Sequence, residues 1–294
     1  MSRTKRVTVA ALNIVTHPHS PNAYIELLSE MFALKQAAAV HGEQRMLISS
    51  LDQSEKDNGV ITGSIARFTE ISSDLPWFNA ITLDVAAEDE VQEINIPEGL
   101  KPNYVSFLFY FDAMTHTFVF EQHLSSFNVS PNSVFKLISH LAEQDPIKER
   151  YGAIKVTLIQ DKESLKEVFG IFKLREIAIH IDRPNPDDLS SYDEEVQRRL
   201  GDQNATALDV VLKTDRSASL KPDASTLALA EVATRNGSVD TRGTDINGAP
   251  QVASTNSHPL FVPYQYDSGH PSLGKAQMAG AAQKLLGILF GRQP

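Results

Sequence analysis

The stretch from Thr234 to Thr255, TRNGSVDTRGTDINGAPQVAST, decides how the second half of the chain folds. It holds two turn signals, Asn236-Gly237 and the run DINGAP, and the residues after each signal are typical of short strands. The periodic run just before it, DASTLALAEVATRNG, predicts a helix that ends at Asn236-Gly237. The stretch therefore predicts the end of a helix, a strand, a turn and a second strand.

The same stretch contains a partial calcium-loop string, Asp245-x-Asn247-Gly248. An EF-hand loop also needs an earlier aspartate and a later glutamate at fixed spacing, and neither is present. A second possible metal pair, His17-x-His19, lies between prolines in THPHSPN, which indicates a surface loop. We predict no metal site from either pattern.

From residue 128 onward, the predicted strands and helices alternate along the chain. The predicted strands are residues 153–160, 174–181 and 207–214, and the predicted helices are residues 161–170, 189–201 and 223–237. An earlier helix starts at Ser130-Pro131, an N-cap followed by an N1 proline, and runs to Gln144. This region, residues 128–268, is predicted to be an alternating α/β domain.

The first half has a different pattern. A β-branched run over residues 7–15 predicts a first strand, and the helix signal Ser-Pro-Asn begins an amphipathic segment over residues 20–38. Extended runs follow over residues 44–53, 59–71 and 104–123, the first two joined by the hairpin signal Asn58-Gly59. We predict an α+β protein whose residues 1–127 form a mainly antiparallel sheet with a packed helix.

The C-terminal residues 269–294 are apolar, carry only two lysines and one arginine, and predict a helix. The segment is too short to span a bilayer, so docking on the core or on a second subunit is expected. The alternative is membrane contact through an interfacial helix.

Composition excludes several function classes. The chain has 294 residues and no cysteine, which rules out thiol nucleophiles, disulfides, thiolate zinc sites and iron–sulfur clusters. It has no P-loop, no G-x-S-x-G elbow and no H-E-x-x-H helix. We therefore expect a non-enzymatic protein with no catalytic residues and no cofactor.

The first apolar run carries Asn13 and no cleavage pattern, so we expect a strand rather than a signal peptide, and a cytoplasmic protein.

The formal net charge is −10, and it is unevenly distributed. Residues 1–122 contain 8 basic and 16 acidic residues, whereas residues 123–294 contain 19 basic and 21 acidic residues. An acidic chain binds nucleic acid only through a local basic patch. That patch is expected in the second half, and the acidic first half is expected to meet a protein partner.

The candidate nucleic-acid-binding residues come from three neighbouring segments of the second half. They are Lys173, Arg175, Lys213, Arg216, Lys221, Arg235 and Arg242. If the segments lie side by side, their positive charges form one phosphate-binding patch. The alternative is that each pairs with a nearby carboxylate, such as Glu176 or Asp215, on an ordinary surface.

A competing hypothesis is a magnesium-dependent nuclease, because carboxylates that hold Mg²⁺ are the minimum requirement of that chemistry. The carboxylates available for it are Asp182, Asp187, Asp188, Asp209, Asp240 and Asp245.

Three segments together, EIAIHIDRPNPDDL, NATALDVVLKT and RNGSVDTRGTDINGAPQVASTNSHP, carry a resemblance. Their order resembles the C-terminal part of an uncharacterised bacterial family associated with phage defence, and is similar to the lambda exclusion protein RexA. The resemblance covers less than half of the chain and carries no catalytic motif. It implies a homodimer of α+β domains that binds DNA without sequence preference and acts as an antiviral sensor for a separate effector.

Overall fold

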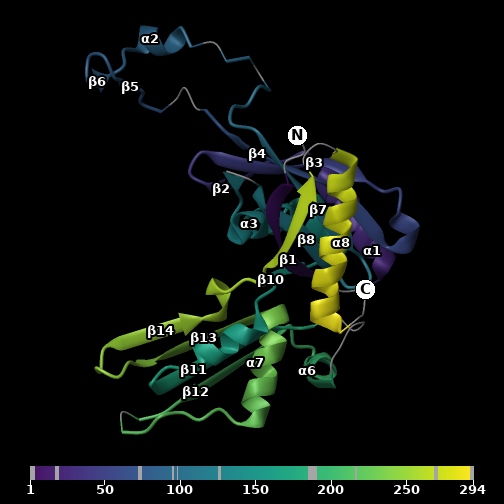
Figure 1. Cartoon of the computed structure of the whole chain (residues 1–294), viewed down its shortest axis with the longest axis vertical. Helices are drawn as coiled ribbons and strands as arrows, with labels where there is room; N and C mark the ends of the chain where they lie inside the picture. The colour runs from purple at the N-terminus through teal and green to yellow at the C-terminus, as the bar shows by residue number, and fades with distance from the viewer. Residues whose placement is uncertain are drawn as a thin grey trace.

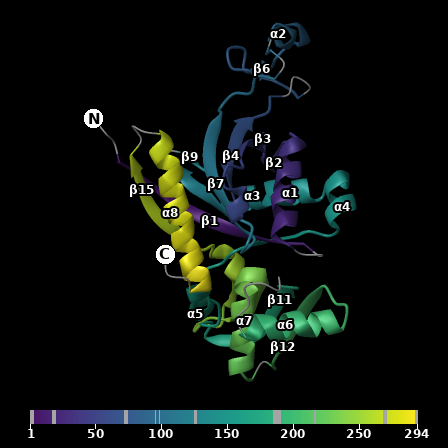
Figure 2. The ribbon, with the colours of Figure 1, turned by 90° about the vertical axis from the view of Figure 1, so that its right-hand side faces the viewer.

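The computed structural model describes residues 4–16, 20–71, 75–94, 96–97, 99–124, 127–184, 191–215, 217–267 and 271–291. The fold is α+β, as the sequence predicts, with a large antiparallel sheet and a separate sheet of four strands (Figures 1 and 2). The two sheets lie at different levels along the long axis of the molecule.

The large sheet has the strand order β10-β1-β8-β7-β4-β3-β2. Its strands are β1 (Thr4–Val15), β2 (Ala38–His41), β3 (Gln44–Asp52), β4 (Val60–Thr69), β7 (Val105–Asp112), β8 (Thr117–Leu124) and β10 (Lys155–Leu158). Two further strands join it, β9 (Phe127–Asn128) beside β8 and β15 (Val262–Asp267) beside β1. The predicted hairpin of residues 44–71 is confirmed as β3 and β4, with η1 (Lys56–Asn58) in the turn and Gly59 at φ 77°.

One face of the large sheet is covered by α1 (Pro21–Ala33) and α3 (Pro131–Ala142), and α4 (Asp145–Tyr151) follows. Both long helices begin as predicted, because Ser20 and Ser130 cap them through their side chains and a proline stands at the start. Their apolar stripes pack on five phenylalanines of β7 and β8, among which Phe109 and Phe118 stack with ring centroids 4.7 Å apart. This is the largest core of the protein.

The opposite face is covered by α8 (Pro271–Phe290), the predicted C-terminal helix. Alternation along β1 explains the two cores, because Ala10 and Leu12 face α1 and α3 while Val9 and Ala11 face α8. Leu285 of α8 is fully buried in this second core. The tail thus docks on the protein's own sheet. No helix in the described ranges is long and apolar enough to cross a membrane.

The small sheet is antiparallel with the order β12-β11-β13-β14. Its strands are β11 (Lys173–Asp182), β12 (Ala207–Lys213), β13 (Gly237–Thr244) and β14 (Pro250–Ser254). Its helical segments are η2 (Lys162–Ser164), α5 (Leu165–Val168), α6 (Ser191–Asp202), α7 (Ala224–Asn236) and η3 (Thr255–Ser257). Side chains Ile177, Ile179 and Ile181 of β11 face a core shared with α6 and α7. Glu176, Ala178 and His180 alternate with them and face the other way.

The stretch from Thr234 to Thr255 has the predicted form: α7 ends at Asn236, and β13 and β14 follow. Gly237 has an extended backbone, so its glycine is required by close packing rather than by its conformation. A Cβ at Gly237 would lie 1.9 Å from the carbonyl oxygen of His180, and one at Gly243 would lie 2.2 Å from that of Lys173. The two glycines allow β13 to lie against β11 along its whole length.

The predicted domain boundary near residue 127 does not separate the two sheets. Helix α3 and strand β10 follow that boundary and belong to the large sheet, as does β15 much later in the chain. The small sheet with its helices is therefore an insertion between β10 and β15. A short strand such as β10 has the same sequence pattern whichever sheet it joins. The pattern therefore predicted that β10 belongs to the second domain, whereas it pairs with β1 of the large sheet.

An arm leaves the large sheet between β4 and β7 and is absent from the sequence-based description. Within residues 70–104 the structure describes 70–71, 75–94, 96–97 and 99–104, with β5 (Phe78–Asn79), β6 (Asp84–Val85) and α2 (Glu88–Gln92), and these elements stand clear of the body in both views (Figures 1 and 2). Strands β4 and β7 pair directly below it. At its base, the side chains of Glu70 and Lys101 form an ion pair.

A buried carboxyl group lies beneath α8. Glu121 of β8 is 3% exposed, accepts a hydrogen bond from the Leu108 N–H at 2.7 Å, and accepts another from the Tyr264 hydroxyl. Burial raises the pKa of Glu121, and the two hydrogen bonds offset only part of this effect. The folded state therefore holds this proton more tightly than the unfolded chain does.

The raised pKa of Glu121 predicts that stability falls as the pH rises through the folded-state pKa, because ionisation then places a charge in the core. Glu121→Gln keeps the shape and can still bond both partners, so it is expected to remove this pH dependence. Urea unfolding between about pH 4 and about pH 8 would measure it. Glu43→Gln, an exposed matched change, should keep the wild-type profile, and an unchanged profile in Glu121→Gln would contradict the assignment.

Candidate nucleic-acid interface

Strand pairing in the small sheet brings together basic residues that are far apart in the sequence. Glu176 of β11 is paired with Lys213 of β12 on one side and with Arg242 of β13 on the other. Lys173, three residues earlier, is paired with Thr244. The neighbouring segments predicted to carry positive charge do lie side by side at one end of this sheet.

Two more basic residues belong to this end. Arg175 lies at the irregularity in the β11–β13 pairing, and the Leu220 N–H donates to the Leu174 carbonyl at 2.8 Å, which places Lys221 beside the start of β11. We call this group the basic end; its residues are Lys173, Arg175, Lys213, Lys221 and Arg242.

The members of the basic end differ in how they are held. Lys213 forms an ion pair with Glu176 at 3.2 Å. Arg175 donates to the carbonyl oxygens of Asp215, at 2.6 Å, and of Ala218, and so fixes the loop after β12. Lys173, Lys221 and Arg242 are exposed and have no ion-pair partner within the part of the chain that the structure describes. Those three cations are available to a phosphate, whereas the other two are partly engaged.

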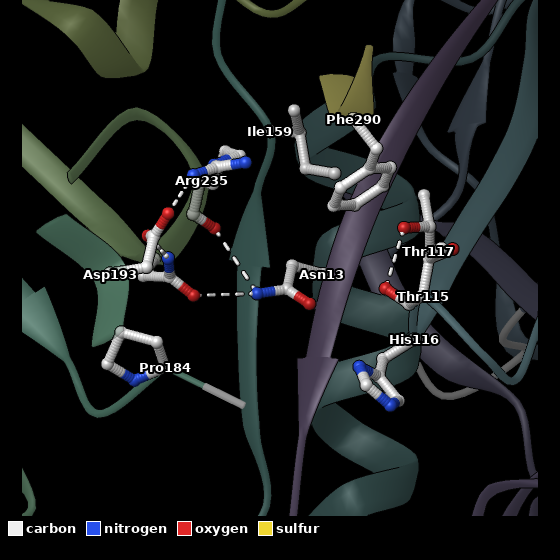
Figure 3. Close-up of a pocket in the computed structure, with 10 residues that line it drawn as sticks. Asn13, Thr115, His116, Thr117, Ile159, Pro184, Asp193, Arg235 and Phe290 are labelled. Atoms are coloured by element: carbon white, nitrogen blue, oxygen red, sulfur yellow. Dashed lines mark hydrogen bonds and ion pairs between the residues drawn. The ribbon is translucent and has the colours of Figure 1, made fainter. Parts of the chain in front are cut away.

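Arg235 lies elsewhere, and the structure does not bring it to the basic end. Its guanidinium pairs with Asp193 of α6, and the Asn13 side chain of β1 donates to the Asn236 side chain at 3.0 Å (Figure 3). The Asp193 side chain is 1% exposed and that of Arg235 is 18% exposed. We call Asn13, Asp193, Arg235 and Asn236 the domain junction, because they join the two sheets. Arg216, the remaining candidate, lies outside the described residues.

The domain junction also reaches α8. The Arg235 guanidinium lies 3.5 Å from the Leu289 carbonyl oxygen and 6.0 Å from the Phe290 ring centroid. The cavity beside it, seen in Figure 3, has a volume of only about 40 Å³. Such a space holds only a few waters. The guanidinium is already engaged by the buried Asp193, which favours a structural role for Arg235.

Breaking the junction should destabilise the fold. Asp193→Ala is expected to lower the free energy of unfolding by about 3 kcal/mol or more, because it leaves a largely buried guanidinium without its partner. Denaturant unfolding would measure this change. Asp202→Ala, on the same helix, removes an exposed pair with Arg198 and should cost under about 1 kcal/mol. Equal stability losses in both variants would contradict the structural role.

The other end of the small sheet carries Asp182, Asp209 and His180. The Nδ1 of His180 lies 2.7 Å from a carboxylate oxygen of Asp209, and its Nε2 lies 3.7 Å from one of Asp182. Lys155 of β10 is 3.2 Å from Asp182. A cleft of about 400 Å³ opens here, between this end and α3, with Phe135 in its wall.

The carboxylates of the nuclease hypothesis are only partly gathered at this end. Asp182 and Asp209 flank His180, and Asp240 lies on β13 opposite Ala178. Asp187 and Asp188 lie outside the described residues. Within the ranges that the structure describes, no three His, Asp or Glu side chains are arranged to hold a metal ion.

Asp245 has a local role in the turn between β13 and β14. Its carboxylate accepts hydrogen bonds from the backbone N–H groups of Asn247 at 2.9 Å and Ala249 at 2.8 Å, and Gly248 takes a φ of 82°. This is the geometry of an aspartate that stabilises a turn. The structure confirms the turn rather than a calcium loop. His17 and His19 lie outside the described residues.

Comparison with known proteins places the chain in a family. The family described as Domain of unknown function (DUF4747) matches residues 5–281. The chain belongs to the DUF4747 family. The match runs from β1 into α8, so the DUF4747 domain comprises both sheets, the arm and the domain junction. No curated protein matches the chain.

Proposed function

We propose that this DUF4747 protein is a non-enzymatic sensor that binds nucleic acid through its basic end and works with an effector protein in antiviral defence. The observation that carries the proposal is the strand register that places Lys173, Lys213 and Arg242 on three adjacent strands at one end of one sheet. Exposed cations on a rigid sheet suit a phosphate backbone, whose contacts dominate nucleic-acid affinity.

The chemistry of the basic end favours binding without sequence preference. Lysine contacts phosphate as a point charge, and the basic end has three lysines and two arginines. The guanidinium of Arg175 already donates to backbone carbonyls, which leaves Arg242 as the exposed fork-shaped donor of the group. This composition positions a backbone and reads little of the base edges.

The antiviral setting is supported by the resemblance of the C-terminal segments to the phage-defence family and to RexA. In this proposal the protein is cytoplasmic, forms a homo-oligomer, and recognises phage nucleic acid or a phage protein assembly as the sign of infection. The acidic first half then contacts the effector, because it carries 16 acidic and only 8 basic residues up to residue 122.

Charge removal at the basic end tests the binding. The variant Lys173→Ala/Lys221→Ala/Arg242→Ala is expected to bind labelled double-stranded DNA at least about tenfold more weakly, and to reduce the slope of log affinity against log salt by about 2 to 3, one contact per residue. Fluorescence anisotropy at several salt concentrations would measure both quantities, in magnesium and in chelator, with DNA integrity checked afterwards.

The matched control removes the same charge from the large-sheet side. Lys35→Ala/Lys56→Ala/Lys148→Ala alters three exposed lysines away from the small sheet and should keep the wild-type affinity and slope. Equal losses in the two triple variants would show that only net charge matters. DNA cleavage in magnesium would contradict a non-enzymatic protein, and absence of binding by wild type at low salt would exclude the nucleic-acid proposal.

Phage growth tests the biological setting. Deleting the gene from its bacterial host should raise the plating efficiency of the phage that it excludes, and the basic-end triple variant should behave like the deletion, because recognition is lost while the fold remains. The Lys35/Lys56/Lys148 variant should still exclude the phage. Unchanged phage growth with and without the locus, over a broad phage panel, would refute the antiviral role.

A further inference from the structure

The arm exposes large apolar side chains that its own chain does not cover. Seven of them are more than half exposed: Leu75 at 54%, Phe78 at 67%, Ile81 at 94%, Leu83 at 75%, Val85 at 66%, Leu100 at 62% and Tyr104 at 63%. Clustered exposure of this kind marks an interaction surface, whereas single exposed apolar residues are ordinary. The arm therefore has the character of a docking element.

The described residues of the arm contain little regular structure. Its sheet has only two strands, β5 and β6, joined by the pairs Phe78 with Val85 and Asn79 with Asp84. A two-stranded hairpin is marginally stable alone in water. Local hydrogen bonds hold the tip, including one from the Asn79 side chain to Glu90 at 2.8 Å. A partner that buries the apolar side chains would supply the missing stabilisation.

Charge indicates which partner surface fits. Residues 70–104 contain eight acidic residues and one lysine, so the arm is acidic as well as apolar. The basic end has the opposite charge and is bordered by exposed apolar side chains: Phe172 at 58%, Val211 at 53%, Ile246 at 76% and Val252 at 74%. Val211 and Val252 lie on the two edge strands of the small sheet. The two surfaces thus have opposite charge, and both expose apolar side chains.

One chain cannot join these two surfaces within itself. The arm and the small sheet lie at opposite ends of the long axis in both views (Figures 1 and 2). In a two-fold dimer, a contact between the arm of one copy and the small sheet of the other would occur twice. Such a dimer would bury twice the surface area of a single arm contact, and a larger buried area favours a stable interface.

We propose that the arm of one copy docks on the basic end of a second copy, in a reciprocal dimer. The apolar side chains of the arm cover Val211 and Val252, and its carboxylates face Lys173, Lys221 and Arg242. One consequence rests on the proposed function. Because nucleic acid and the arm use the same basic end, nucleic acid competes with the arm and separates the dimer.

Sedimentation velocity of the full chain at several concentrations tests the dimer. Wild type is expected to be dimeric, and two variants are expected to be monomeric: Phe78→Ser/Ile81→Ser/Leu83→Ser in the arm, and Val211→Ser/Val252→Ser in the sheet. Mixing the two variants restores one intact arm and one intact sheet, so a heterodimer with one of the two contacts should form, with weaker affinity than wild type.

The control and the contrary outcomes are equally specific. Met114→Ser/Leu227→Ser changes exposed apolar residues outside both surfaces and should leave the dimer intact. Circular dichroism checks that each variant is folded. A wild type that is monomeric up to its solubility limit, a dimer that survives the arm variant, or a mixture that forms no heterodimer would overturn the proposal. Short duplex DNA added to the dimer tests the competition separately, so failure of DNA binding leaves the dimer result standing.

Discussion

Strand β1 imposes the constraint on which the rest of the structure depends. One edge of β1 pairs with β8, while its other edge pairs with β15 along the N-terminal part and with β10 along the C-terminal part. Both faces of β1 are covered, one by α1 and α3 and the other by α8. A strand that is buried on both faces and paired on both edges fixes the register of its neighbours, because a slip would turn its apolar side chains to the wrong face.

This constraint determines where the inserted domain lies. Strands β10 and β15 share one edge of β1, so the chain between them must leave that edge and return to it. The domain junction stands at this point, where Asn13 of β1 bonds to the end of α7 and Arg235 of α7 bonds to Asp193 of α6. The junction lets the small sheet keep a definite orientation although its own core, built on Ile177 and Ile179, is separate.

Much of the local structure was predictable from the sequence, because local signals decide it. Serine followed by proline began α1 and α3, and the polar turn before Gly59 joined β3 to β4. The partners of short strands were not predictable, as β10 shows, because the pattern of a strand does not state its sheet. The arm was missed for a related reason: the sequence of residues 70–104 has no sustained period, and many of its described apolar side chains, such as Phe78 and Ile81, are exposed rather than packed in a core.

The candidate site shows the same division. The register of β11 with β12 and β13 places Lys173, Lys213 and Arg242 at one end of the small sheet. The sequence showed only that their segments are neighbours along the chain. Arg235 was misplaced, because nearness in sequence to the turn said nothing about which way the end of α7 faces. A signal was available in α6: Asp193 stands among apolar-face positions, and a buried carboxylate requires a cation from another segment.

The small sheet is polarised along its strands, and this polarity constrains how any polyanion binds. Lysines and arginines occupy the basic end, while Asp182, Asp209 and His180 occupy the opposite end beside the cleft. A phosphate backbone laid along the strands would meet carboxylates after a few residues, since each residue advances about 3.3 Å. A backbone that crosses the strands at the basic end meets cations from adjacent strands, together with Glu176, which is paired with Lys213, and with Asp215 and Asp245 in the adjoining turns. For the nucleic acid of the proposed function, the favourable path therefore runs across β12, β11 and β13 rather than along them.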